Sequence, residues 1–164
     1  MSGGSEKGKS ETGAWNCKSC LEIKIEELMT REVVTVHEDA LLEEIFTLFE
    51  KYLYHTLPVL NSRGELAGII DQDIVLEILL FAHIPRAKHT HLVAVRSLGV
   101  HAKDVMITHP VTIPPGSTLI DAAEMMMKHR FDRVCVTEKG KLVGVISKRD
   151  IVREVSRRRA LEMG

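Results

Sequence analysis

The 164-residue sequence predicts an α/β (α+β) fold in which two pseudo-symmetric β-α-β-β-α repeats pack sheet to sheet. GIIDQDI, beginning at residue 68, is nearly repeated as GVISKRD, beginning at residue 144. Residues 25–70 align with 102–146, and Met29 and Met106 are paired at a separation of 77 positions. Each repeat has about 55–60 residues, a size that is marginal alone, so the two sheets are expected to bury each other.

Each repeat is expected to begin with a short helical turn and an extended piece, at 33–36 or 110–113, followed by an amphipathic helix. In the second repeat, Thr118 and Asp121 have the spacing of a capping box, in which each side chain binds the backbone N–H of the other residue. The helix in the first repeat is predicted from apolar residues at three- and four-residue spacing: Leu41, Leu42, Ile45, Leu48, Phe49 and Tyr52.

Two strands and a final helix complete each repeat. The strands are expected at 56–60 and 66–70, and again at 133–137 and 142–146. The turns between them contain Gly64 and Gly140, because glycine tolerates the backbone angles that tight turns need. The final helices are expected at about 72–83 and 148–160.

Composition narrows the class of protein. Lys and Arg (22) balance Asp and Glu (23), whereas a nucleic-acid-binding surface needs excess positive charge. The longest apolar stretch, at 74–84, is shorter than the roughly 20 residues that a membrane span needs. Residues 1–15 contain no apolar signal segment, and three cysteines suggest a reducing compartment without a disulfide framework. We therefore expect a cytoplasmic protein.

Four motifs, spread over the two repeats, resemble the CBS (cystathionine β-synthase-type) domain. They are a Met-Thr-like start, a P/V-x-T-V segment, an h-P-V-h strand, and G-h-h-[ST]-x-x-D leading into a helix. Two copies in tandem resemble the CBS pair, or Bateman module, over about residues 22–160. The expected division is a flexible polar tail at 1–21, CBS domain 1 at 22–83, a linker at 84–99 and CBS domain 2 at 100–161.

This resemblance implies a regulatory module and not an enzyme. Such a module binds AMP, ADP, ATP or a relative between its lobes, needs no other cofactor, forms a homodimer and regulates a protein that the sequence does not identify. No Ser-His-Asp or Cys-His spacing suggests nucleophilic catalysis.

Ser147 and Asp150 have two interpretations, because S-x-x-D is also a capping box. They could do no more than start the last helix. The resemblance implies instead that Asp150 holds a ribose and Ser147 lies beside phosphate. The complete candidate nucleotide site is Asp150, Ser147, Thr112, Arg133, Lys148, Arg149 and Gly144, with Gly144 admitting the ligand closely.

The first repeat carries an acid at the corresponding junction, Asp71, and Asp73 is aligned with Asp150. A carboxylate about 4 Å from a phosphate charge costs roughly 4 kcal/mol at an effective dielectric of 20. We therefore expect unequal sites, with the first site empty or holding an uncharged ligand near Asp73, Asp71, Thr35 and His55. Mg²⁺ could also bind beside the two carboxylates.

Cys17 and Cys20 leave further functions open. Their C-x-x-C spacing could bind zinc if two protomers pooled four thiolates, or could undergo redox chemistry, although ordinary tail cysteines are also compatible. The histidines from His83 to His109 could likewise ligate a metal. A ligand-free dimerisation scaffold is the remaining alternative.

Overall fold

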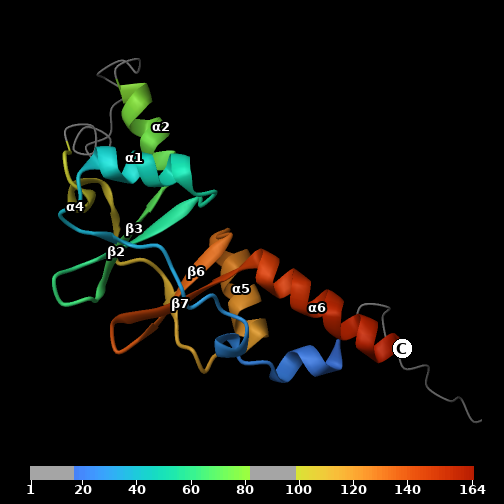
Figure 1. The fold of residues 1–164 in the computed structure, drawn as a ribbon. Coiled ribbons are helices and arrows are strands. Elements are labelled where there is room, and N and C mark those ends of the chain that lie inside the picture. Colours follow the sequence, from blue (N-terminus) through green and yellow to red (C-terminus); the bar gives the residue numbers. More distant parts are fainter. Residues whose placement is uncertain (1–16, 82–98) are drawn as a thin grey trace, which may run out of the picture.

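The computed structural model describes residues 17–81 and 99–164, in which two sheets lie at the centre with helices around them (Figure 1). The first repeat forms β1 (Val36–His37), α1 (Leu42–Lys51), β2 (Thr56–Leu60), β3 (Leu66–Asp71) and α2 (Gln72–Phe81). The second forms α4 (Ala102–Val105), β4 (Ile107–Thr108), β5 (Thr112–Ile113), α5 (Leu119–His129), β6 (Arg133–Glu138), β7 (Lys141–Ser147) and α6 (Lys148–Met163). The predicted α+β class is confirmed.

The two repeats share strand pairing as well as element order. β1 runs parallel to β2, which is antiparallel to β3, and β5, β6 and β7 repeat this arrangement. The hairpin turns contain Gly64 and Gly140 at φ of 75° and 80°, which confirms the expected use of glycine. Thr118 and Asp121 form the predicted capping box at the start of α5.

The first segment of each repeat crosses to the sheet of the other repeat. β4 precedes the strands of the second repeat in the sequence, yet it pairs with β3 and extends the first sheet to four strands. In the same way Thr30 bridges Val145 of β7, with two backbone hydrogen bonds of 2.9 Å. We call lobe one the sheet β1–β4 with α1, α2 and α4, and lobe two the sheet β5–β7 with α5, α6 and the N-terminal residues 17–30.

Gly68 and Gly144 make these crossings sterically possible. A Cβ on Gly144 would lie 2.6 Å from Met29 Sδ and 2.9 Å from the Thr30 carbonyl oxygen. A Cβ on Gly68 would meet the corresponding segment, 2.6 Å from the Ile107 carbonyl oxygen. The prediction that Gly144 admits a ligand is therefore wrong, because the crossing chain already fills the space that its missing side chain leaves.

Each lobe has its own apolar core between its sheet and its helices. Successive strand side chains point to opposite faces, so alternate residues enter the core. In lobe one these include Leu57, Val59 and Ile70, which pack on Ile45 of α1 and Ile74 of α2. In lobe two the corresponding cluster is Val134, Val136, Ile146, Met126 and Ile25.

The expected flexible tail included residues 17–21, but the structure gives these residues defined positions. Residues from Cys17 onward are packed: Lys18–Glu22 form a 3₁₀ helix (η1) and Ile25–Glu27 a second one (η2), shown in blue in Figure 1. Cys17 and Cys20 form a disulfide and are buried, so the expectation of no disulfide is also wrong. Residues 1–16, most of the expected linker, and His83, His89 and His91 lie outside the described residues.

Helix α6 continues to Met163, three residues beyond its predicted end. None of the helices that the structure describes is long and apolar enough to cross a bilayer.

Within α6 the buried Glu154 accepts hydrogen bonds from Arg157 Nη2 (2.6 Å) and Arg158 Nε (2.7 Å). These arginines therefore hold a carboxylate within the helix.

We expect Glu154→Gln to lower stability by roughly 1 to 2 kcal/mol at pH 7, because Arg157 is partly exposed and water screens the pair. The hydrogen bond from Arg157 lowers the pKa of Glu154 to about 2. The stabilisation is therefore complete above about pH 4.5, the usual pKa, and is lost as the pH falls toward 2. Urea unfolding at several pH values should show the variant and wild type converging in acid. Glu124→Gln, at an exposed position on α5, is the control.

Candidate functional site

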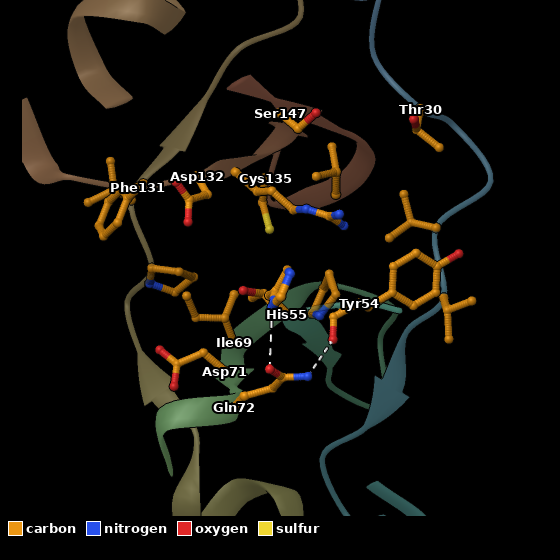
Figure 2. A pocket seen from close by; sticks show the side chains of 18 of the residues that line it. Thr30, Tyr54, His55, Ile69, Asp71, Gln72, Phe131, Asp132, Cys135 and Ser147 are labelled. Carbon is orange, nitrogen blue, oxygen red and sulfur yellow. Dashed lines mark hydrogen bonds between the residues drawn. The ribbon is translucent and has the colours of Figure 1, made fainter. Parts of the chain in front are cut away.

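A cleft of about 820 Å³ lies between the two lobes. Its walls are strand residues that point away from the two cores: Pro58 and Ile69 from lobe one, Cys135 and Val145 from lobe two. Figure 2 shows side chains from the two sheets pointing toward each other across this space. The predicted sheet-to-sheet arrangement therefore encloses a cavity that is open to a ligand.

The start of α6 forms part of the lobe-two wall. Asp150 Oδ2 accepts hydrogen bonds of 2.8 Å from both the backbone N–H and the hydroxyl of Ser147. Ser147 Oγ in turn accepts one of 3.1 Å from the backbone N–H of Asp150. The capping interpretation is thus confirmed. It does not exclude ligand binding, because Asp150 Oδ1 has no hydrogen-bond partner in the described part of the chain.

Positive charge gathers on the same wall. The cleft is lined by four arginines: Arg130, Arg133, Arg149 and Arg153. Among the described residues, none of the four forms an ion pair with a carboxylate. Because a guanidinium is always charged and presents several donors, these side chains suit an anionic ligand.

Two of these arginines were not predicted. Arg153 lies in the second turn of α6, which begins at Lys148, and it lines the cleft. Its four-residue spacing from Arg149 places both on one helix face, a signal that could have identified it. Arg130 follows α5 in a left-handed conformation (φ 56°), and no sequence signal indicated that it would reach the cleft.

Arg133 also contacts the opposite lobe. Its guanidinium carbon lies 5.7 Å from the ring centroid of Tyr54, within the range of a cation–π interaction. Lys148, by contrast, pairs with Asp132 at 3.2 Å and does not line the cleft. Lys148 is therefore not placed in the cleft and instead pairs with Asp132, which does line it.

The lobe-one wall carries the two acids Asp71 and Asp73 and the amide of Gln72. Asp71 caps α2, accepting a hydrogen bond of 3.2 Å from the backbone N–H of Ile74, because Asp is a favoured residue at a helix N-cap. Burial raises the pKa of Asp71, and the charge of Asp73 raises it further. Gln72 is held by Tyr54 and His55: its Nε2 donates to the Tyr54 carbonyl oxygen at 3.1 Å, and its Oε1 lies 3.3 Å from His55 Nδ1 (Figure 2).

Asp73 is not the structural counterpart of Asp150. Thr56 pairs with Asp71 and Arg133 pairs with Ser147, so both helices begin one residue after these junctions. Asp73 is then the second helical residue and Asp150 the third, about 100° apart around the axis. Ile74, buried in lobe one, occupies the position of Asp150, and the alignment that paired the two aspartates is wrong.

The extended segment that begins each repeat lines the cleft, but with residues that come before the predicted threonines in the sequence. Thr35 and Thr112 are not among the lining residues, and Thr112 pairs with Cys135 in the β5–β6 ladder. The preceding residues line the cleft in their place: Glu32, Val33 and Val34 in one segment, His109, Pro110 and Val111 in the other. The aromatic rings of Tyr54 and Phe131, which the prediction missed, complete the walls.

Two further groups bear on the chemistry of the site. Burial raises the pKa of the Cys135 thiol to about 11, so it lies in the cleft as a neutral group. Over residues 17–81 and 99–164, no group of three or more His, Cys, Asp or Glu side chains is placed to hold a metal ion. The arrangement therefore suits binding of a small polar ligand through arginines, a carboxylate oxygen and aromatic faces.

The chain is similar in sequence to a known family and to curated proteins. The family model for the CBS domain matches residues 25–80 and 102–157. An uncharacterised protein of Methanocaldococcus jannaschii is 28% identical over 149 aligned residues, covering 78% of this chain and 88% of that protein.

Two solved structures share the fold at lower identity. CBSX2 from Arabidopsis thaliana, in complex with AMP, has a TM-score of 0.74 at 20% identity, covering 82% of this chain and 97% of that one. The CBS domain pair of protein MJ0100, in complex with 5′-methylthioadenosine and S-adenosyl-L-methionine, has a TM-score of 0.65 at 18% identity, covering 81% and 95%. Both similarities concern the fold.

Proposed function

Because the chain belongs to the CBS domain family, we propose that it is a regulatory module that binds a phosphorylated adenosine-containing ligand between its lobes. AMP, ADP and ATP are the candidate ligands. The observation that carries the proposal is the lobe-two wall, where four arginines without carboxylate partners among the described residues lie beside Ser147 and Asp150. Relatives of the same fold in complex with AMP or with S-adenosyl-L-methionine support an adenosine compound.

In this proposal the ligand is oriented by charge. Its phosphates lie against the arginine wall, and Asp150 Oδ1 accepts a hydrogen bond from the ribose. The lobe-one wall does not accept a second phosphorylated ligand, because Asp71 would place a carboxylate where a phosphate has to lie. An uncharged adenosine could still use Gln72 and the ring of Tyr54.

The ligand would act by shifting the balance between two arrangements of the lobes. Arg133 links the lobes through the ring of Tyr54, and a bound phosphate would compete for the same guanidinium. A ligand shifts a conformational equilibrium only if it binds the two arrangements with different affinity. The contact between Arg133 and Tyr54 offers that difference, and an unidentified regulated protein would read the outcome.

We also propose that the chain forms a homodimer through its outer helices. Large apolar side chains remain exposed on α1, α2, α5 and α6: Phe46, Leu76, Leu80, Ile120, Met127 and Val152. Exposed apolar side chains in such number favour contact with a partner surface. Light scattering after size-exclusion chromatography should give twice the mass of the 18.4 kDa chain.

A thermal-shift screen of adenosine, AMP, ADP and ATP tests the ligand. A ligand that binds only the folded form, at 100 times its dissociation constant, stabilises by about 2.7 kcal/mol. For a chain of this size we expect Tm to rise by roughly 5 to 10 °C. Asp150→Ala should remove most of that rise, whereas no rise with any of the four compounds would contradict the proposal.

Asp121→Ala is the matched control for Asp150→Ala. Asp121 forms the equivalent capping box with Thr118 at the start of α5 but does not line the cleft. Both substitutions remove a cap and should lower the Tm of the free protein to a similar extent. Only Asp150→Ala should reduce the ligand-induced rise.

A further inference from the structure

The disulfide between Cys17 and Cys20 lies in a segment that joins the C-terminal helix to the cleft. We call residues 17–34 the strap. Cys17, Cys20 and Ile23 form an apolar cluster with Leu119 at the start of α5 and with Ile151 and Val155 of α6. Because Ile151 is the residue directly after Asp150, this cluster supports the part of α6 that carries the site.

Polar contacts hold the strap on the same two helices. Ser19 Oγ donates a hydrogen bond of 2.6 Å to Glu162, and Arg158 Nη1 donates one of 3.5 Å to the Ser19 carbonyl oxygen. The backbone N–H of Leu119 donates to the Ile23 carbonyl oxygen at 2.9 Å. The strap therefore links α5 to α6, although it is about a hundred residues or more from both helices in the sequence.

The other end of the strap forms part of the cleft. Met29 lies in the lobe-two core, and Thr30 is hydrogen-bonded to Val145 of β7. Thr30 and the segment Glu32–Val34 then line the cleft itself. A displacement of the strap near Cys17 can thus alter the cleft in two ways. It can shift the start of α6, against which the strap packs, and it can shift the strap residues that line the cleft.

We propose that Cys17 and Cys20 are a reversible thiol–disulfide site whose oxidised form holds the strap in place and whose reduced form loosens it. A C-x-x-C pair is well suited to exchange because its two sulfurs are close in either state. Here the sequence separation is three residues, and the Cα atoms are 5.3 Å apart. The effect on ligand affinity rests on the function proposed above, whereas the effect on the strap does not.

The reaction partner is a dithiol. One thiolate of the reductant attacks Cys17 Sγ or Cys20 Sγ, the Sγ–Sγ bond breaks, and a mixed disulfide forms. The second thiol of the reductant then breaks the mixed disulfide and releases the cysteine that was bound in it. Two electrons and two protons have then reached Cys17 and Cys20, and the reductant has become a disulfide. Ser19 Oγ, 3.6 Å from Cys17 Sγ, can then accept a hydrogen bond from the new thiol.

Hydrogen exchange under defined redox conditions tests the site on the intact protein. The protein is equilibrated with oxidised or reduced dithiothreitol, and alkylation followed by mass spectrometry reports the state of each cysteine. We expect Cys17 and Cys20 to be protected from alkylation when oxidised and both to be labelled when reduced. The disulfide closes a loop that restricts the locally unfolded form of the strap, and reduction removes this restriction. Backbone amides of the strap and of the first turns of α6 should therefore exchange on the order of tenfold faster after reduction.

Cys17→Ala/Cys20→Ala provides the matched control, because it keeps small apolar side chains in the cluster and cannot be oxidised there. Its exchange should equal that of the reduced wild type in both buffers. Labelled thiols at Cys17 and Cys20 in oxidised dithiothreitol would overturn the proposal. So would strap and α6 exchange that is the same in both states.

Titration with ATP in the two buffers separates this inference from the proposed function. We expect a several-fold weaker affinity after reduction and no dependence on the buffer in the double-alanine variant. Absence of ATP binding in both states would count against the proposed function alone, since the exchange measurement still decides whether the strap responds. Equal ATP affinity in the two states would overturn the link from the strap to the cleft.

Discussion

Replacing Ser147 by Asp should weaken binding of AMP and ATP by about a hundredfold to a thousandfold. The substitution places at the start of α6 the residue type that Asp71 supplies at the start of α2. Two unit charges about 4 Å apart repel by roughly 4 kcal/mol at an effective dielectric of 20, and about 1.4 kcal/mol corresponds to tenfold. Asp is a good N-cap, so the helix should still form. Isothermal titration calorimetry with both nucleotides measures the effect.

Ser147→Asn separates the charge from the loss of the hydroxyl. Asn caps a helix about as well as Ser or Asp but is neutral. We expect it to weaken binding by no more than about tenfold, the scale of one hydrogen bond. If Ser147→Asp bound nucleotide as tightly as Ser147→Asn, charge at this junction would not control phosphate binding.

The second large effect is a loss of stability at Gly144, against which the segment around Thr30 crosses. Gly144→Ala should destabilise the protein by about 1–3 kcal/mol, the usual cost of overpacking. The added Cβ would lie 2.9 Å from the Thr30 carbonyl oxygen, which is backbone and is held by Val145. The Thr30–Val145 bridge would therefore have to shift, and nucleotide affinity should fall with it because Thr30 lines the cleft. Urea unfolding measures the stability.

Gly116→Ala is the matched control for this substitution. A Cβ at Gly116 has no atom within 4 Å, and its φ is not in the left-handed region. Alanine there should leave stability unchanged or raise it by up to about 1 kcal/mol, because it restricts the unfolded chain. A Gly144→Ala protein as stable as Gly116→Ala would show that the crossing segments are not closely packed against β7.

Local patterns predicted most of the repeated architecture. β2, β3, β6 and β7 follow from their apolar sequences and from the glycines in their turns, and all four lie within a residue or so of the expected positions. The caps at Ser147 and Thr118 follow from spacing alone. In each case the determining interactions are between residues close in the chain.

The features that were missed depend on contacts between distant residues. The pairing of β4 with β3 could not be derived from two extended residues, since the partner is chosen by tertiary packing and by the space at Gly68. The disulfide of Cys17 and Cys20 has a spacing that zinc or redox chemistry would share. Arg153 was missed because a residue's place on the cleft-facing side of α6 depends on how α6 packs against distant parts of the chain.

Calorimetric stoichiometry with ATP tests the central claim, that the lobe-two wall accepts phosphates and the lobe-one wall rejects them. Wild-type protein titrated with ATP should show one site per chain, and the same heats should be lost on replacing Arg133 and Arg149 by Gln. Asp71→Ser, which removes the carboxylate from lobe one, should leave that first site intact. Two equal ATP sites per chain in the wild type, or one site that survives loss of both arginines, would contradict the account.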